Sequence, residues 1–204
     1  MTPKLRLADG ITLYIARHGE TEANVEKRFQ GHSLNTPLTR KGRAQAKEIA
    51  RILKAHADPA KLDYVSSPMQ RTCETIALVR EHLGLDAERF SSDARIMEID
   101  LGLWDGLTHA QARGLDPKLY DRRENNKWTV RAPGGENYAD VGKRARLWLM
   151  GLTRDTFAVS HGAFIRIVRG LFEGLDGKQI SDLDEPQGVV FRIRGTTVKR
   201  YDTS

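Results

Sequence analysis

The chain has 204 residues, 39% of them hydrophobic and 29% charged, with a formal net charge of +6. This composition predicts a folded soluble protein and excludes a disordered or membrane-spanning chain, because no apolar stretch is long enough to cross a bilayer. No apolar segment follows the first basic residues, and Cys73 is the single cysteine, so we expect a cytoplasmic protein. The positive charge favours anionic small molecules over nucleic acid, because lysine and arginine are scattered along the chain.

Short apolar runs alternate with amphipathic segments, which predicts strands that alternate with helices. In chain order the pattern first predicts a strand at 11–16, a functional loop at 17–37, a helix capped by Thr39 and a strand at 62–65. A helix follows, with Pro68 in its first turn and Gly84 at its end, and then short helices within 108–130 and a helix around 141–152. The last predicted elements are a strand at 157–159, a helix from Phe164, and a hairpin of 189–193 with 197–201. This alternation predicts a three-layer α/β/α sandwich with a mostly parallel central sheet. We expect one domain over residues 1–204, with a small helical excursion at about 106–132.

Segments that contain histidine, arginine or serine follow three of the predicted strands, at 17–18, 66–71 and 160–162. The carboxyl ends of parallel strands meet at one edge of a sheet, and ligands of such sheets bind there. We therefore expect Arg17, His18, Arg71 and His161 to lie in one site.

This set of residues favours an anion over a metal ion. Arginines beside the histidines would repel a cation, and no HExxH or HxxxH spacing supports zinc. Guanidinium groups match phosphate oxygens in pairs, and they would neutralise the charge that spreads over a transferring phosphoryl group. The segments thus predict a site for phosphoryl transfer.

His18 is the expected nucleophile of such a reaction. A neutral imidazole is nucleophilic near pH 7, and neighbouring arginines disfavour its protonated form. We expect a backbone carbonyl to hold the proton on the other ring nitrogen, so that a phosphohistidine can form. His161 is expected to donate to the phosphoryl oxygens, and to be charged when a phosphate dianion is bound.

Several motifs together resemble those of the histidine phosphatase superfamily, the phosphoglycerate mutase-like group. The motifs are residues 17–21 with Asn24 and Gln30-Gly31, then 38–42, 66–75, 98–106, 133–136 and 159–162, in the order in which that family carries them. The resemblance covers residues 12 to about 170.

The resemblance implies a role for each matching residue. His18 would become phosphorylated, Arg17, Arg71 and His161 would complete the phosphate pocket, and Glu98 would be the acid and base. Asn24, Gln30, Gly31 and Gly162 would line the substrate pocket. The resemblance also implies that neither a metal nor another cofactor is required, and it leaves open whether Asp100 shares the role of Glu98.

Three positions depart from the family pattern. Ala23 stands where many members carry an aromatic residue, Asp105 replaces a glutamate, and Asn137 replaces a serine or threonine. We expect these positions to surround the substrate, so they affect substrate identity more than reaction type. The roles of Trp104 and Trp128, in the core or in the wall of the cleft, stay open.

The leading hypothesis is a phosphomonoester phosphatase for a small anionic phosphorylated metabolite, because the insertions typical of the glycolytic mutases are absent. The alternative is a cofactor-dependent phosphoglycerate mutase, in which a second substrate hydroxyl accepts the phosphoryl group. A catalytically silent phosphate-binding module and a nucleic-acid-binding protein are further alternatives. We expect no nucleic-acid partner and no membrane partner, and a homodimer is possible through an exposed edge strand.

Overall fold

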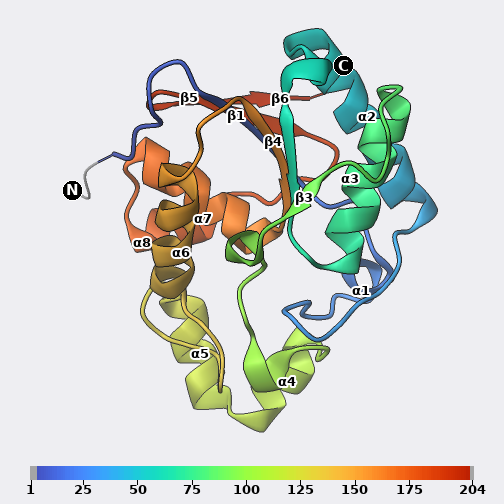
Figure 1. The fold of residues 1–204 in the computed structure, drawn as a ribbon. Helices are drawn as coiled ribbons and strands as arrows, with labels where there is room; N and C mark the ends of the chain where they lie inside the picture. Colours follow the sequence, from blue (N-terminus) through green and yellow to red (C-terminus); the bar gives the residue numbers. More distant parts are fainter. Residues whose placement is uncertain (1–3, 203–204) are drawn as a thin grey trace.

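The computed structural model describes residues 4–202, and in this part of the chain a six-stranded sheet lies between two layers of helices (Figure 1). The strand order is β3-β2-β4-β1-β5-β6. The strands are β1 (Thr12–Arg17), β2 (Asp63–Ser66), β3 (Ser91–Ser92), β4 (Thr156–Ser160), β5 (Val190–Arg194) and β6 (Thr197–Tyr201). β1 to β4 pair in parallel, whereas β5 is antiparallel to β1 and forms a hairpin with β6. The predicted sandwich with a mostly parallel sheet is confirmed.

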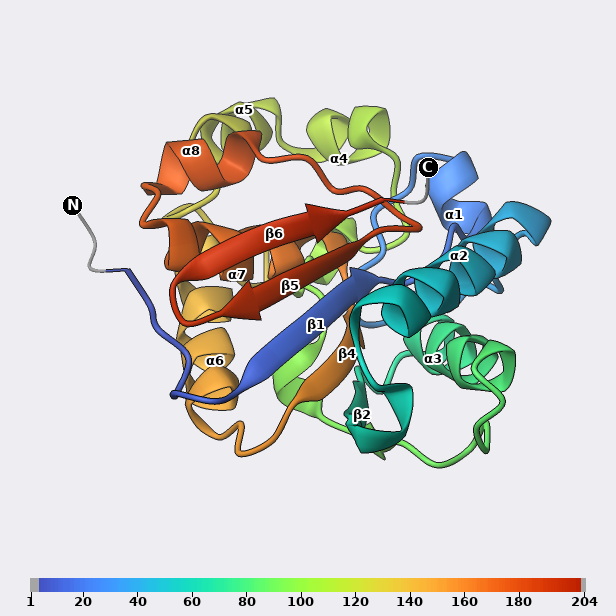
Figure 2. The same cartoon turned by 90° about the horizontal axis from the view of Figure 1, so that it is seen from above.

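Each face of the sheet carries its own layer of helices (Figure 2). One layer contains α2 (Arg40–His56) and α3 (Gln70–His82), and the other contains α6 (Tyr138–Met150), α7 (Gly162–Glu173) and α8 (Gly177–Asp182). The side chains of β1 explain this arrangement, because successive residues of a strand point to opposite faces. Leu13 and Ile15 join the core beneath α6 and α7, whereas Tyr14 and Ala16 join the core beneath α2 and α3.

The register of the parallel strands places three strand ends at the same edge of the sheet. Arg17 pairs with Ser160 across β1 and β4, and Ser66 pairs with Val159 across β2 and β4. The segments that follow these strands therefore begin side by side. This edge of the sheet positions the site described below.

Two predicted helix ends agree with the structure, whereas the helices expected around 141–152 and from Phe164 run over Tyr138–Met150 and begin at Gly162. Thr39 caps α2, where its hydroxyl accepts a hydrogen bond from the Gly42 N–H, and Gly84 follows α3 with a positive φ of 72°. The prediction for Pro68 is wrong, because α3 begins at Gln70 and Met69 is its N-cap. The short helices α1 (Glu22–Val25) and α8 were not predicted, because each spans less than two turns and shows no apolar periodicity.

The segment between the third and fourth strands contains α4 (His109–Leu115) and α5 (Pro117–Asn125), where short helices were predicted. In Figure 1 these two helices form the lower end of the molecule, away from the sheet. Thr108 and Asp116 cap them through side-chain oxygens. Within residues 4–202, no helix is both long and apolar enough to span a membrane.

Gly42 tests how closely α2 must approach the loop after β1. A Cβ atom at this position would lie 2.8 Å from the Glu20 backbone nitrogen and closer still to the Glu20 carbonyl oxygen. Both obstacles are backbone atoms, so we expect Gly42→Ala to lower the free energy of unfolding by about 1–3 kcal/mol. Gly114→Ala is the matched control, because no atom lies within 4 Å of its Cβ position. In the last turn of α4 it should leave the stability unchanged or raise it by up to about 0.5 kcal/mol.

Urea unfolding of both variants checks this prediction. Equal stabilities of the two variants would show that the loop after β1 yields to the added methyl group.

Candidate active site

The ends of β1 and β4 bring His18 and His161 together. Their ring centroids are 5.3 Å apart, with an angle of 62° between the ring planes. Both side chains are buried, with 2% of His18 and 0% of His161 exposed. The predicted meeting of these two histidines is therefore seen in the structure.

The His18 ring is held in one tautomer. Its Nδ1 lies 2.8 Å from the Gly19 carbonyl oxygen, and a carbonyl can only accept, so Nδ1 carries the proton. The lone pair is then on Nε2. Burial first, and then the charges of Arg71 and Arg17, hold the pKa of His18 well below its usual range. Neutral His18 thus presents an unprotonated nitrogen, as the sequence predicts.

His161 follows β4 and lies beside the His18 ring. Its Nε2 is 2.8 Å from the Ser67 hydroxyl oxygen, and its buried Nδ1 has no hydrogen-bond partner within residues 4–202. Burial and the charge of Arg71 hold the pKa of His161 well below its usual range, so the ring is neutral in the free protein. A bound dianion would supply the opposite charge that favours protonation.

Arg71 is fully buried behind the two histidines. Its guanidinium donates to the carbonyl oxygens of Leu34 at 3.2 Å, Gln30 at 3.3 Å and Gly31 at 3.0 Å, while its Nε is unpartnered among the described residues. Burial lowers the pKa of Arg71 to about 10, so it stays charged at neutral pH. Arg71 therefore fixes the loop after α1 and brings positive charge close to both histidines.

Arg17 leaves the end of β1 on the open side of the site. Its Nη1 donates to the Glu185 backbone oxygen at 2.7 Å and lies 3.7 Å from the Glu185 carboxylate. The same carboxylate binds Arg166 at 2.9 Å. The Nε atoms of Arg17 and Arg166 are buried and make no hydrogen bond within the described part of the chain.

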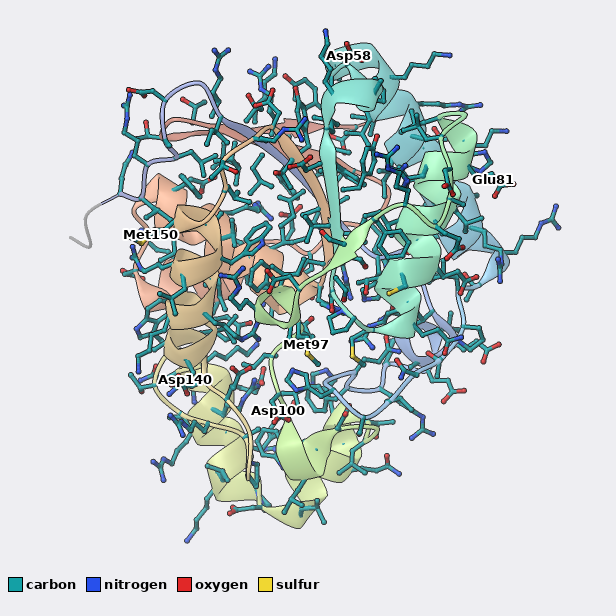
Figure 3. All side chains as sticks on the ribbon, in the orientation of Figure 1. Asp58, Glu81, Met97, Asp100, Asp140 and Met150 are labelled. Atoms are coloured by element: carbon teal, nitrogen blue, oxygen red, sulfur yellow. The ribbon has the colours of Figure 1, made fainter. Side chains whose placement is uncertain are left out.

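Glu98 is held at the start of α7. Its Oε1 accepts from the Ile99 N–H at 2.9 Å, and its carboxylate accepts from the Ala163 and Phe164 N–H groups at 3.3 Å each. Burial first, and then repulsion by Glu185, raise the pKa of Glu98. Met97 and Asp100, from the same segment, lie near the centre of the molecule above α4, whereas Asp58, Glu81 and Met150 lie at the periphery (Figure 3).

A cavity of about 410 Å³ opens between these side chains and the helical excursion. Arg17, His18, Asn24, Gln30 and Glu98 all line it. The cavity residues also include Phe29, Ile99, Leu101, His109, Tyr138, Ala163 and several charged side chains from α5 and α7. The size fits a small molecule rather than a polymer.

Asn24 and Gln30 are fixed by hydrogen bonds to each other. The Asn24 Nδ2 donates to the Gln30 Oε1 at 3.3 Å, and the Gln30 Nε2 donates to the Thr36 hydroxyl at 2.9 Å. The Gln187 Nε2 donates to the Asn24 Oδ1 at 3.1 Å and to the His18 carbonyl at 3.0 Å. This network ties the chain on both sides of α1 to the His18 backbone.

Gly31 and Gly162 were expected to line the substrate pocket, but neither lines the cavity, and both serve close packing instead. The Gly31 N–H donates to Asp105 at 2.6 Å, and its carbonyl accepts from Arg71, so both of its backbone groups are engaged. At Gly162, a Cβ atom would lie 2.5 Å from the Glu185 carboxylate and 3.3 Å from the Arg17 guanidinium carbon. Gly162 thus leaves the room in which Arg17 and Glu185 meet.

The expectation that the three departures surround the substrate is wrong, because none of them lines the cavity of about 410 Å³. Asp105 binds the backbone N–H groups of Gly31 and Ser33 at 2.6 Å each and so holds the loop that Arg71 holds from the other side. Asn137 caps α6, and Ala23 is buried within α1. The three residues thus stabilise the loop and the helices next to the cavity and do not form its wall.

Other residues that the sequence left open lie outside the cavity. Trp104 is fully buried in the core, and Trp128 is partly buried against it. Asp100 accepts from the Gly102 N–H at 2.8 Å within a turn, and burial raises the pKa of the Cys73 thiol. Within residues 4–202, no group of three or more His, Cys, Asp or Glu side chains is placed to hold a metal ion.

Sequence reasoning missed Glu185, Gln187 and Arg166. The first two precede β5, which runs antiparallel to β1, so the segment before this strand lies at the edge where the parallel strands end. An antiparallel last strand was not part of the argument about parallel strand ends. Arg166 had a signal, since it is the first charge in the otherwise apolar start of α7, one turn after Gly162.

Comparisons with known proteins agree with this geometry. The family model for the histidine phosphatase superfamily (branch 1) matches residues 13–199, and the chain belongs to this superfamily. A bifunctional protein of Mycobacterium tuberculosis is 36% identical over 134 residues, which are 66% of this chain and 35% of that protein. The fructose-2,6-bisphosphatase of Saccharomyces cerevisiae is 30% identical over 162 residues, which are 78% of this chain and 34% of that protein. The chain thus spans about a third of the length of these curated relatives.

Solved structures share the whole fold. Bacillus stearothermophilus YhfR superposes with a TM-score of 0.81 at 28% identity, covering 96% of this chain and 98% of that one. A mycobacterial glucosyl-3-phosphoglycerate phosphatase in complex with VO3 superposes with a TM-score of 0.79 at 28% identity, covering 96% of this chain and 100% of that one.

The neutral buried histidines predict a stability that falls in mild acid. The pKa values of His18 and His161 lie well below 6.5 in the native state. The unfolded chain therefore binds more protons below about pH 6.5, and the free energy of unfolding should fall there by up to about 1.4 kcal/mol per pH unit for each histidine. Above pH 7 this effect vanishes.

Urea unfolding at pH 7.5 and 5.5 checks this for the wild-type protein, for His161→Gln, and for His82→Gln, which changes an exposed histidine. His161→Gln should lose less stability on acidification than the other two. The same loss in all three proteins would contradict a neutral buried His161.

Proposed function

We propose that the protein is a phosphomonoester phosphatase that forms a covalent phosphohistidine at His18 and acts on a small anionic phosphorylated metabolite. One observation carries the proposal. Three buried nitrogens have no partner in the described part of the chain, the Nε atoms of Arg17 and Arg71 and Nδ1 of His161, which can donate once its ring is protonated. The charges of both arginines act on His18, the centroid of the His161 ring lies 5.3 Å from that of the His18 ring, and Nε2 of His18 is free. Buried polar groups are normally hydrogen-bonded, so this set of donors calls for an anion.

In the first step, His18 Nε2 forms a bond to phosphorus while the ester P–O bond breaks. The leaving oxygen takes a proton from Glu98, whose raised pKa favours the protonated form needed for this step. The Gly19 carbonyl, which accepts from Nδ1–H, stabilises the positive charge that develops on the phosphorylated ring.

In the second step, the Glu98 carboxylate takes a proton from a water molecule as that water attacks phosphorus. The N–P bond breaks, inorganic phosphate leaves, and neutral His18 and protonated Glu98 are restored. Throughout, Arg17, Arg71 and His161 face the charge on the equatorial oxygens, which is the main requirement of phosphoryl transfer.

The relatives support this reaction class. Their names describe a fructose-2,6-bisphosphatase and a glucosyl-3-phosphoglycerate phosphatase, both of which act on small phosphorylated metabolites. We further propose that the reaction needs no metal or other cofactor, since charge stabilisation comes from arginine and histidine. A cytoplasmic location, a single domain over residues 1–204, and possible pairing into a homodimer remain predictions from the sequence.

Trapping of the phosphoenzyme tests the proposal. Wild-type protein mixed with a radiolabelled phosphomonoester and quenched in base should carry label on His18, because phosphohistidine survives base and not acid. His18→Ala should carry none and lose at least about 10³-fold in kcat. His82→Ala, a matched change at an exposed histidine, should behave like the wild type.

Turnover should persist in excess EDTA. Label that remains in His18→Ala, or efficient isomerisation of 3-phosphoglycerate primed by 2,3-bisphosphoglycerate in place of phosphate release, would contradict the proposal.

Glu98→Gln tests the role of the acid. The amide cannot protonate the leaving oxygen, so the rate of phosphoenzyme formation should fall by about 10²–10⁴-fold for alkyl esters and far less for p-nitrophenyl phosphate, whose leaving group needs no proton. Glu124→Gln is the control, because Glu124 also lines the cavity and lies on α5, away from the strand ends. Stopped-flow kinetics with both substrates give the comparison, and equal slowing of the two esters would assign the acid to another residue.

A further inference from the structure

The cavity carries more positive charge than one phosphate group requires. Six basic side chains and three carboxylates line it, which leaves an excess of three positive charges, or four when Glu98 is protonated. The basic residues are Arg17, Lys27, Arg28, Arg123, Lys127 and Arg166, and the acidic ones are Glu98, Glu124 and Glu185. A cleft lined with one sign of charge attracts ligands of the opposite sign.

Several of these basic side chains already have a carboxylate partner. Arg28 pairs with Glu26, a residue outside the cavity, and Lys127 pairs with Glu124 at 3.0 Å. Arg166 pairs with Glu185, which Arg17 also approaches. Arg17 belongs to the phosphate pocket. Two cations of the cavity, Arg123 and Lys27, therefore remain that are neither part of the phosphate pocket nor held in a close ion pair of their own.

Arg123 is a buried cation with little compensation. Only 4% of its side chain is exposed, and its Nε has no hydrogen-bond partner within residues 4–202. Its contact with Glu124, at 3.4 Å, is long and is shared with Lys127. The guanidinium lies over the Trp104 ring, 5.6 Å from its centroid, which fixes its place in the cavity wall. A buried charge without a full partner is costly unless a ligand completes it.

The backbone conformation of Lys27 is a second, independent observation that points to a functional role. Its φ is 56°, the left-handed region that residues with a Cβ atom disfavour, and among the described residues it is the one non-glycine with a positive φ. Lys27 lines the cavity, is exposed and forms no ion pair within residues 4–202. Glycine would fit this backbone without strain, so a lysine stands here against the local conformational preference, and such residues cluster at functional sites.

We propose that Lys27 and Arg123 bind a second anionic group of the substrate, a carboxylate or a phosphate, on the same small molecule that carries the scissile phosphate. The inference rests on the proposed phosphatase function, and it narrows the substrate to compounds with two anionic groups. It also assigns the helical excursion a role, because Arg123 lines the cavity from α5, which together with α4 forms the lower end of the molecule in Figure 1.

Two matched pairs of substrates test this inference. 3-Phosphoglycerate and glycerol 3-phosphate differ by one carboxylate, and fructose 2,6-bisphosphate and fructose 6-phosphate differ by one phosphate. The wild type should prefer the member with two anionic groups by at least tenfold in kcat/KM in one pair or both, and the pair that shows the preference identifies the group that is bound.

Lys27→Gln and Arg123→Gln should each reduce this preference about tenfold and leave the singly charged substrates nearly unchanged. Lys143→Gln, which removes an exposed lysine outside the cavity, should keep the preference. Lys27→Gly separates function from folding, because it removes the backbone strain. It should raise the melting temperature while lowering the preference as Lys27→Gln does.

Equal kcat/KM values within both pairs for the wild type, or equal loss on both members of a pair in the variants, would overturn the inference. If the wild type hydrolyses none of these compounds and no p-nitrophenyl phosphate, the proposed function fails. Calorimetric affinities of the same four compounds for His18→Ala protein then still decide the subsite: tighter binding of the doubly anionic members that requires Lys27 and Arg123 supports it, and equal affinities reject it.

Discussion

The chemistry of this site depends on an imidazole that stays neutral while it is buried among guanidinium groups. Desolvation and the charges of Arg71 and Arg17 both disfavour protonation of His18, and the Gly19 carbonyl fixes the remaining proton on Nδ1. The parallel pairing of β1 with β4 sets this arrangement, because it places His18 and His161 beside each other. Arg17 and Arg71 add positive charge beside this ring, and Gln187 and Asp105 hold the adjoining backbone.

The loop after α1 is held from two sides by opposite charges. Arg71 donates to its carbonyl oxygens, and Asp105 accepts from its N–H groups at Gly31 and Ser33. A loop carries many backbone groups that no strand or helix satisfies, so buried partners for them substitute for regular structure. Arg71 therefore serves the scaffold and the site together, and its buried charge is met by backbone carbonyl oxygens, with no carboxylate ion pair among residues 4–202.

Sequence reasoning reached the layers of the fold and the residues of the strand ends, because hydrophobic periodicity and local motifs encode both. The Thr39 cap and the apposition of His18 with His161 follow from such local signals combined with parallel pairing. Glu185 could not be found in this way, since its partners Arg17 and Arg166 are distant in sequence and the direction of β5 decides the contact. Asp105 was expected near the substrate because it departs from the family pattern, whereas its carboxylate binds the loop backbone instead.

The antiparallel direction of β5 has a consequence for how the protein is made. Gln187, in the segment that leads into this strand, donates to the His18 carbonyl, so the contacts of one pocket span positions 18 to 187 of the chain. A ribosome must synthesise nearly all of the described sequence before the pocket can assemble. A partly translated chain therefore contains the arginines and histidines of the pocket before they are held in place. His18 acquires all of its contacts only when the last strands join the sheet.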